Sequence, residues 1–280
     1  MSTESFPTPS SDRREVVDRD DPAIADRREV VDRDDPAIAA FVSLRDPVVR
    51  RELQCFVAEG PDVLAQAVSL GLEVVCALID GRHPTPAGLA PSCSVFAASP
   101  KLIGEITGLG VHRGVLALVR RPRERTLDET LVDARRVVVL EGVENPVNVG
   151  LIARSAAGLG IDALLVDATS ADPLFRRAVT ASRGATLHIP WVRIASAVAA
   201  LDGRGFLTVA LTPDPAAADL RTIGLADVDR VALLVGTEGT GLGTSTLAAA
   251  DLRARIPMTR GVDSLNVATA TAIACWELTR

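Results

Sequence analysis

The stretch ENPVNVGLIARSAAG, residues 144–158, follows an apolar run and sets two asparagines and one arginine in an otherwise apolar helical pattern. Asn148 is placed to cap a helix that runs to about Leu159, and Pro146 fits an extended approach to that helix. Arg154 needs a carboxylate, a phosphate or an interface partner if it is buried, because an unpaired buried charge is strongly unfavourable. An arginine that extends its guanidinium into solvent is the alternative.

A second polar motif, GTEGTGLG at residues 236–243, comes directly after the apolar run VALLV. It lacks the lysine of a phosphate-binding P-loop, and its glycines do not fit G-x-G-x-x-G. Glu238 would repel a phosphate, so we expect this loop to bend around an uncharged or cationic ligand. A tight structural turn explains the glycines equally well.

The third motif is IPMTRGVDSLNVATATAIACWEL, residues 256–278. Its second part predicts a helix whose small residues allow tight packing against another helix. Ser264 and Asn266 lie at the expected start of this helix. Their side chains can cap the helix or point into a site.

The elements that must position these motifs are strand-like runs separated, for the most part, by helix-like segments. The runs are residues 137–140, 163–167, 206–211, 231–235 and 254–258. Such alternation predicts a mostly parallel sheet covered on both faces. Ligands of these sheets bind beyond the carboxyl ends of the strands, which is where the motifs lie.

Residues 40–120 predict a separate small α/β unit. Its expected elements are helices over 61–71 and 99–109, the second capped by Ser99, and strands over 73–80, 94–99 and 114–119. The charged, proline-bearing stretch 121–136 is expected to be a linker to a second domain over 137–280.

Residues 12–25 read DRREVVDRDDPAIA, and residues 26–39 repeat the same fourteen letters. The unit is too short and too charged for a solenoid repeat. We therefore expect residues 1–39 to be a disordered tail, with a short charged interaction arm as the alternative. The second copy runs directly into AFVSLRD, so its end could already belong to the first domain.

The net charge of −6 at first argues against a nucleic-acid partner. However, residues 1–40 hold six of the 30 basic and 11 of the 36 acidic residues, so the remainder is nearly neutral. The four cysteines and three histidines form no metal-ligand or disulfide pattern. No apolar run approaches the roughly 20 residues of a membrane span, and the stretch MSTESFPTPSSDRRE lacks the apolar core of a signal peptide. We therefore expect a cytoplasmic protein without membrane or metal.

Together the three motifs, in this order and spacing, resemble the signature motifs of the SpoU/TrmH branch of the SPOUT methyltransferases. DPLFRRAVTASRGATLHIP, residues 172–190, is similar to the segment that connects them in that family. The resemblance covers residues 137–280, and residues 40–120 are more loosely similar to the small RNA-binding domain that often precedes it. The implied fold is a small N-terminal α/β substrate-binding domain followed by an α/β-knot domain, whose mostly parallel sheet carries a trefoil knot.

The resemblance also implies an activity: transfer of a methyl group from S-adenosylmethionine to a ribose 2′-hydroxyl of RNA, with ribosomal RNA favoured over transfer RNA. The residues implied in catalysis are Asn148, Arg154, Glu238, Ser264 and Asn266. Those implied in cofactor binding are Leu211, Gly236, Gly241, Ile256, Met258 and Leu265. In this family the arginine-bearing helix meets the cofactor pocket of a partner subunit, so a homodimer is expected.

Within that scheme Glu238 would attract the sulfonium of the cofactor. Arg154 would hold the acceptor ribose and its phosphate rather than act as a base, because a guanidinium has a pKa above about 12. Further phosphate contacts are expected from residues 118–125 and from Arg176, Arg177 and Arg183, with solvated surface as the alternative.

Two rival interpretations belong to other classes of protein. A catalytically inactive RNA-binding protein on the same scaffold is disfavoured because all five residues implied in catalysis are present. A nucleotide-binding α/β enzyme is disfavoured by the missing phosphate-loop lysine.

Overall fold

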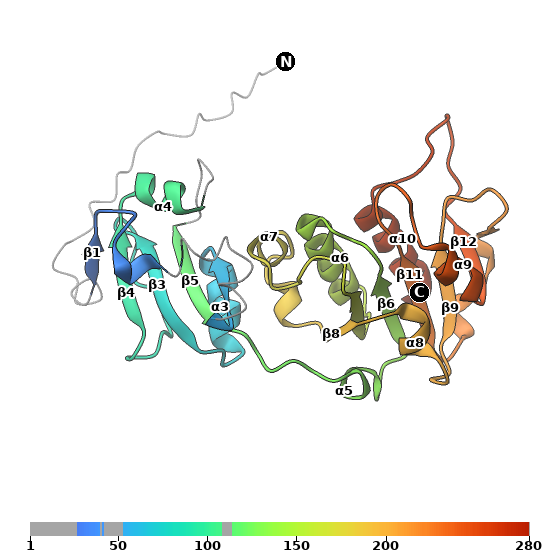
Figure 1. Cartoon of the computed structure of the whole chain (residues 1–280), viewed down its shortest axis with the longest axis horizontal. Helices are drawn as coiled ribbons and strands as arrows, with labels where there is room; N and C mark the ends of the chain where they lie inside the picture. Colours follow the sequence, from blue (N-terminus) through green and yellow to red (C-terminus); the bar gives the residue numbers. More distant parts are fainter. Residues whose placement is uncertain (1–26, 40, 42–52, 108–113, 280) are drawn as a thin grey trace, which may run out of the picture.

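The computed structural model describes residues 27–39, 41, 53–107 and 114–279. Within these residues the chain forms two β-sheets that follow one another along the long axis of the molecule (Figure 1). The first sheet lies within residues 28–120 and the second within residues 136–255. Both carry helices, so the expected α/β class is confirmed.

The first sheet is mixed and has the order β1-β4-β3-β5-β2. Its strands are β1 (Arg28–Val30), β2 (Cys55–Glu59), β3 (Val74–Asp80), β4 (Ser94–Ala98) and β5 (Val115–Arg120). Helices α3 (Pro61–Ser69) and α4 (Pro100–Thr107) accompany it. The predicted elements of this unit are confirmed to within two residues wherever they are described, and residues 108–109 of the expected second helix lie outside the described residues. Ser99 accepts the predicted capping hydrogen bond from the backbone of Leu102 at 3.2 Å.

The second copy of the repeat is folded onto this sheet. Its residues 28–30 form β1, which pairs in parallel with β4. Val30 and Ile38 are buried in the same core, and the 3-10 turn Pro36–Ile38 is capped by the side chain of Asp35. The expectation of a tail that reaches residue 39 is therefore wrong for residues 27–39, because these apolar side chains have a sheet edge to cover. The first copy lies outside the described residues.

The second sheet has the order β10-β12-β9-β11-β6-β7-β8, and every pairing within it is parallel. Its strands are β6 (Arg136–Leu140), β7 (Ala163–Asp167), β8 (Trp191–Ile194), β9 (Leu207–Leu211), β10 (Ala218–Asp219), β11 (Val231–Val235) and β12 (Leu252–Arg255). The predicted parallel sheet is confirmed, and β8 and β10 are additional. The strand expected over 254–258 instead ends at Arg255, and the chain leaves the sheet there.

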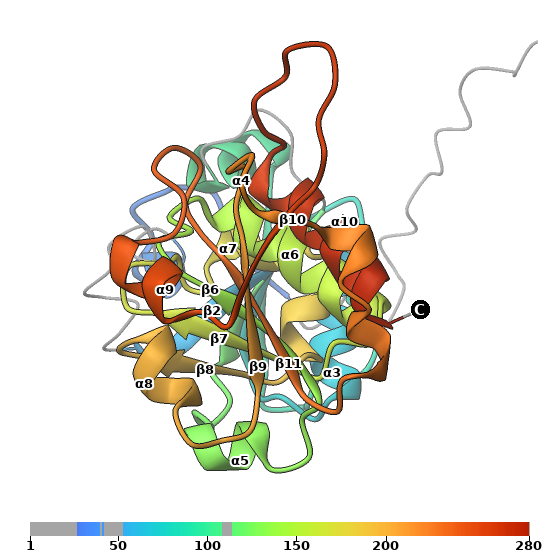
Figure 2. The same ribbon diagram turned by 90° about the vertical axis from the view of Figure 1, so that its right-hand side faces the viewer.

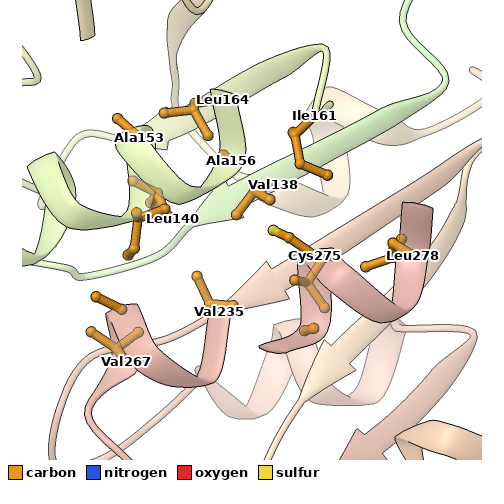
Figure 3. Close-up of a cluster of buried hydrophobic side chains, with 14 of the residues drawn as sticks. Val138, Leu140, Ala153, Ala156, Ile161, Leu164, Val235, Val267, Cys275 and Leu278 are labelled. Carbon is orange, nitrogen blue, oxygen red and sulfur yellow. The ribbon is translucent and has the colours of Figure 1, made fainter. Parts of the chain in front are cut away.

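Helices cover both faces of this sheet (Figure 2). One face carries α6 (Pro146–Gly158) and α10 (Val267–Thr279), and α7 (Arg176–Ala181) packs against α6. The other face carries α5 (Leu127–Leu131), α8 (Ala197–Leu201) and α9 (Thr244–Ala249). Alternate side chains of β6 divide between the two cores: Val138 and Leu140 pack with α6 and α10 (Figure 3), whereas Val137 and Val139 pack with α8. Each face is thus closed by its own apolar cluster.

The expected linker is shorter than 121–136. Helix α5 begins within it, with a capping box in which Thr126 and Glu129 exchange side-chain and backbone hydrogen bonds. The last residue of the stretch, Arg136, already belongs to β6. Among the described residues, no helix combines the length and the apolar composition that a membrane span requires.

Candidate active site

A cavity of about 440 Å³ opens where β9, β11 and β12 end. The end of each strand delivers a loop to its wall, as expected for a parallel sheet. All six residues predicted to bind a cofactor line this cavity: Leu211, Gly236, Gly241, Ile256, Met258 and Leu265. Glu238, Ser264 and Asn266 line it as well.

The glycine loop after β11 forms both a wall of the cavity and a tight turn. A β-bridge joins Thr237 to Gly241, and the backbone of Gly241 adopts a φ of +71°. A Cβ atom added to Gly236 would lie 2.3 Å from backbone atoms of Gly241 and Leu242. The expected tight turn is therefore confirmed, and the turn that requires glycine also shapes the wall of the cavity.

Helix α6 begins earlier than predicted. Asn145 is its N-cap, accepting a hydrogen bond from the backbone of Val147, and Pro146 occupies the first helical position rather than an extended approach. The prediction that Asn148 caps the helix is thus wrong. Asn148 lies in the first turn, is only 4% exposed, and has its side chain free for contacts outside the helix.

The three motifs meet at Glu238. The side-chain amide of Asn148 donates to Oε1 of Glu238 at 2.6 Å, and the amide of Asn266 donates a short hydrogen bond to the same oxygen. Asn266 also donates to Oδ1 of Asn148 at 3.2 Å. No hydrogen bond to the second carboxylate oxygen of Glu238 occurs within the described residues, so this oxygen remains available at the cavity wall.

Asn266 both caps α10 and takes part in the polar cluster at the cavity wall. Its Oδ1 accepts hydrogen bonds from the backbone amides of Ala268 and Thr269, at 3.0 and 3.3 Å, and so caps α10. Its Nδ2 points to Glu238 and Asn148. Ser264 is exposed in the loop before α10 and lines the cavity. The helix cap thereby fixes the orientation of a polar group in the site.

Arg154 is separate from this cluster. It is exposed on α6, does not line the cavity, and has no hydrogen-bond or ion-pair partner among the described residues. It shares its stripe of the helix with Val147 and Leu151, each 38% exposed. On the adjacent α10, Ile273 and Trp276 are also exposed, at 37% and 56%. Arg154 therefore belongs to an apolar outer surface rather than to the cavity of its own chain.

Two acidic residues hold the loops around the site, and the sequence motifs did not reveal them. Glu141, directly after β6, accepts hydrogen bonds from the backbone of Gly243 at 2.6 Å and from the hydroxyl of Thr246 at 2.5 Å. Asp167, the last residue of β7, accepts hydrogen bonds from the backbones of Gly142 and Ser170. The available signal was an acidic residue at the end of each of two neighbouring strands.

The arginine-rich stretch before α5 is mostly neutralised. The pairs are Arg120 with Glu73, Arg121 with Asp172 and Arg123 with Glu129, at 3.2, 2.9 and 2.7 Å. Hydrogen bonds from Arg123 and from the backbone of Thr126 lower the pKa of Glu129 to about 2. No group of three His, Cys, Asp or Glu side chains within the described part of the chain could hold a metal ion.

The family model for the SpoU rRNA methylases matches residues 135–276, which span all three motifs and the cavity. The chain belongs to the SpoU rRNA methylase family. The resemblance drawn from the motifs is thereby confirmed for residues 135–276.

Several relatives carry related descriptions. An uncharacterized tRNA/rRNA methyltransferase of Mycobacterium tuberculosis is 44% identical over 189 residues, which are 66% of this chain and 66% of that protein. The 23S rRNA (guanosine(2553)-2′-O)-methyltransferase RlmP of Bacillus subtilis is 27% identical over 82% of this chain and 90% of its own. The crystal structure of an AdoMet-bound rRNA methyltransferase from Sinorhizobium meliloti has 27% identity and a TM-score of 0.77, covering 90% of this chain and 97% of that one.

Proposed function

We propose that this protein transfers a methyl group from S-adenosylmethionine to a ribose 2′-hydroxyl of RNA, with ribosomal RNA favoured over transfer RNA. The main support for the proposal is the hydrogen-bonded cluster of Asn148, Glu238 and Asn266, in which Glu238 and Asn266 line the cavity. The names of the SpoU relatives support the choice of RNA, and that of the Bacillus subtilis protein supports the ribose 2′-oxygen as acceptor.

The cavity fits S-adenosylmethionine by the chemistry of its lining. Ile256, Met258 and Leu265 provide apolar walls, and the turn at Gly236 presents backbone groups to a ligand. The cofactor, when bound, supplies an electrophilic methyl group on a cationic sulfonium. The free carboxylate oxygen of Glu238 matches that positive charge.

Asn148 and Asn266 both donate hydrogen bonds to Oε1 of Glu238 and so orient this carboxylate at the cavity wall. A hydroxyl held in line with the methyl group reacts faster because its orientation is fixed before reaction. Arg154 is the group suited to hold the acceptor, because its guanidinium can bind a phosphate and a ribose oxygen.

Arg154 does not line the cavity of its own chain, so the proposal includes a homodimer in which it reaches the cavity of a second copy. The exposed apolar side chains around it, Val147, Leu151, Ile273 and Trp276, suit such an interface. The trefoil knot expected from the family is part of the same proposal. It is supported by the return of the chain from β12 to pack α10 against α6.

Methyl-labelled S-adenosylmethionine, incubated with the protein and total RNA from a strain lacking the gene, tests this function. Nuclease digestion and nucleoside analysis should place the label in a 2′-O-methylnucleoside. Cofactor and RNA binding without any label would instead support the inactive RNA-binding protein. Label on a base would overturn the ribose assignment.

A further inference from the structure

Helix α7 lies between the two domains and is held on both sides (Figure 1). Toward α6 the contact is very close: a Cβ atom added to Gly150 would lie 2.3 Å from the carbonyl oxygen of Ala178. Toward the first domain, Val179 and Leu174 share an apolar cluster with Phe56. Because Gly150 and Arg154 are four residues apart on one face of α6, α7 is placed beside the part of α6 that carries Arg154.

Two of the three arginines around α7 are used to fasten it to the first domain. Arg176 pairs with the buried Glu59 at 3.1 Å, and Arg183 pairs with Asp62 at 2.6 Å. The carbonyl of Arg183 also accepts a hydrogen bond from the side chain of Gln66 at 2.7 Å. Arg176 is held by a buried carboxylate and is therefore a poor candidate for the RNA contact expected of it. The pair of Arg183 with Asp62 is exposed and weaker.

Arg177 differs from its neighbours. It is exposed and has no hydrogen-bond or ion-pair partner within the described residues. Arg154, on α6, is exposed and unpaired in the same way, and it lies one helical turn beyond Gly150 on the side that approaches α7. Neither α6 nor α7 contains an acidic residue. Two uncompensated guanidinium groups thus flank the crossing of the two helices.

We infer that Arg154 and Arg177 form a binding site for the phosphodiester backbone of the substrate RNA, next to the nucleotide that receives the methyl group. Two unpaired cations near one another repel until an anion lies between them, and a phosphate accepts the paired N–H groups of guanidinium. This inference rests on the proposed function and extends it to a residue outside the three motifs.

The position of α7 favours RNA as the source of this phosphate. In the proposed dimer the acceptor nucleotide lies at Arg154, so an RNA that contacts the first domain of the same chain and also reaches Arg154 must pass α7. Arg177 is an exposed cation on that path. Arg177 is a positioning residue in this inference, because it contacts the RNA backbone beside the acceptor nucleotide and does not contact the reacting atoms.

The test compares Arg177→Ala with Arg135→Ala in the full-length protein. Arg135 is also exposed and pairs with Asp229. It lies directly before β6, at the amino ends of the strands, whereas the cavity lies at their carboxyl ends. Arg177→Ala should raise KM for RNA about fivefold and reduce the salt dependence of RNA binding by about one counterion. The kcat at saturating RNA, KM for S-adenosylmethionine and melting temperature should stay unchanged, and Arg135→Ala should match wild type throughout.

A fall in kcat for Arg177→Ala at unchanged KM for RNA would overturn the inference, as would identical kinetics of the two variants. If the wild type transfers no methyl group, the proposed function fails separately. In that case RNA retention on filters still decides the inference. An equal Kd for Arg177→Ala and Arg135→Ala would reject it, and a weaker Kd for Arg177→Ala alone would support it.

Discussion

Asn148 donates a hydrogen bond of 2.6 Å to Glu238, a residue 90 positions later in the chain. This bond joins the first turn of α6 to the glycine loop after β11. Its geometry depends on two separate local features, the cap at Asn145 that sets the start of α6 and the turn at Gly236 that folds the loop back. The carboxylate is consequently held at the cavity wall with one oxygen engaged and one available.

Replacing Glu238 by glutamine tests whether that oxygen acts through its charge. Glutamine keeps an oxygen that can accept from Asn148 and Asn266, so the cluster should persist. Affinity for the cationic S-adenosylmethionine should fall about tenfold, which corresponds to 1.4 kcal/mol, whereas affinity for the neutral S-adenosylhomocysteine should not change. Titration calorimetry with both ligands measures this. Glu144→Gln, an exposed carboxylate outside the cavity, is the matched control.

Replacing Arg154 by alanine should abolish methyl transfer and leave S-adenosylmethionine affinity within a few-fold, because Arg154 does not line the cavity of its own chain. Co-expression of Arg154→Ala with Asn266→Ala then tests the proposed dimer. A mixed dimer with sites shared between chains has one site that carries both substitutions and one that carries neither, so activity should reappear. Inactive mixed dimers would show that each site is built from a single chain.

Most of the fold could be predicted because its signals are local. Runs such as VVVL and VALLV are continuous and β-branched, and both became central strands. The strand Trp191–Ile194 was missed because its pattern alternates between buried and half-buried residues at the sheet edge and includes an arginine. The sequence does not distinguish Asn145 from Asn148 as the cap by their local chemistry, because both are asparagines, and only the position of Pro146 favours Asn145.

The contacts that determine the roles of the arginines could not be predicted, because they join distant parts of the chain. Arg176 and Glu59 are 117 residues apart, and nothing near Arg176 indicates such a partner. For the same reason, its free neighbour Arg177 could not be singled out from the sequence. The burial of Val30 and Ile38 of the second repeat copy depends in the same way on a distant partner, the strand β4.

The repeat offers its own matched pair of variants. Ile38→Ala should lower the free energy of unfolding by about 2–4 kcal/mol, because Ile38 is fully buried in the first domain. Ile24→Ala makes the same change at the same place in the first copy, and deletion of residues 1–25 removes that copy altogether. Both should leave the melting temperature almost unchanged. A loss of several degrees on deletion would show that the first copy contributes to the fold.

Asp167 should make stability depend on pH at acid values. Although burial opposes it, hydrogen bonds from Ser170, Thr169 and the backbone lower the pKa of this carboxyl below its ordinary value of 3.8. A lowered folded-state pKa stabilises the fold above about pH 4, and this contribution is lost as pH falls through the folded-state value. Asp167→Asn should therefore cost about 1–2 kcal/mol at pH 7 and progressively less below pH 4, as measured by urea unfolding.

Two glycines of α6 should respond in opposite ways to alanine. Gly150→Ala places a methyl group 2.3 Å from the backbone of Ala178, where no flexible side chain can move aside, so α6 and α7 must separate. The loss should reach about 1–3 kcal/mol, and methyl transfer should fall with it because Asn148 shifts. Gly158 meets nothing within 4 Å, so Gly158→Ala should leave activity intact and stabilise the helix by about 0.5–1 kcal/mol. Thermal unfolding of both variants measures the difference, and equal melting temperatures would contradict the close packing of α6 on α7.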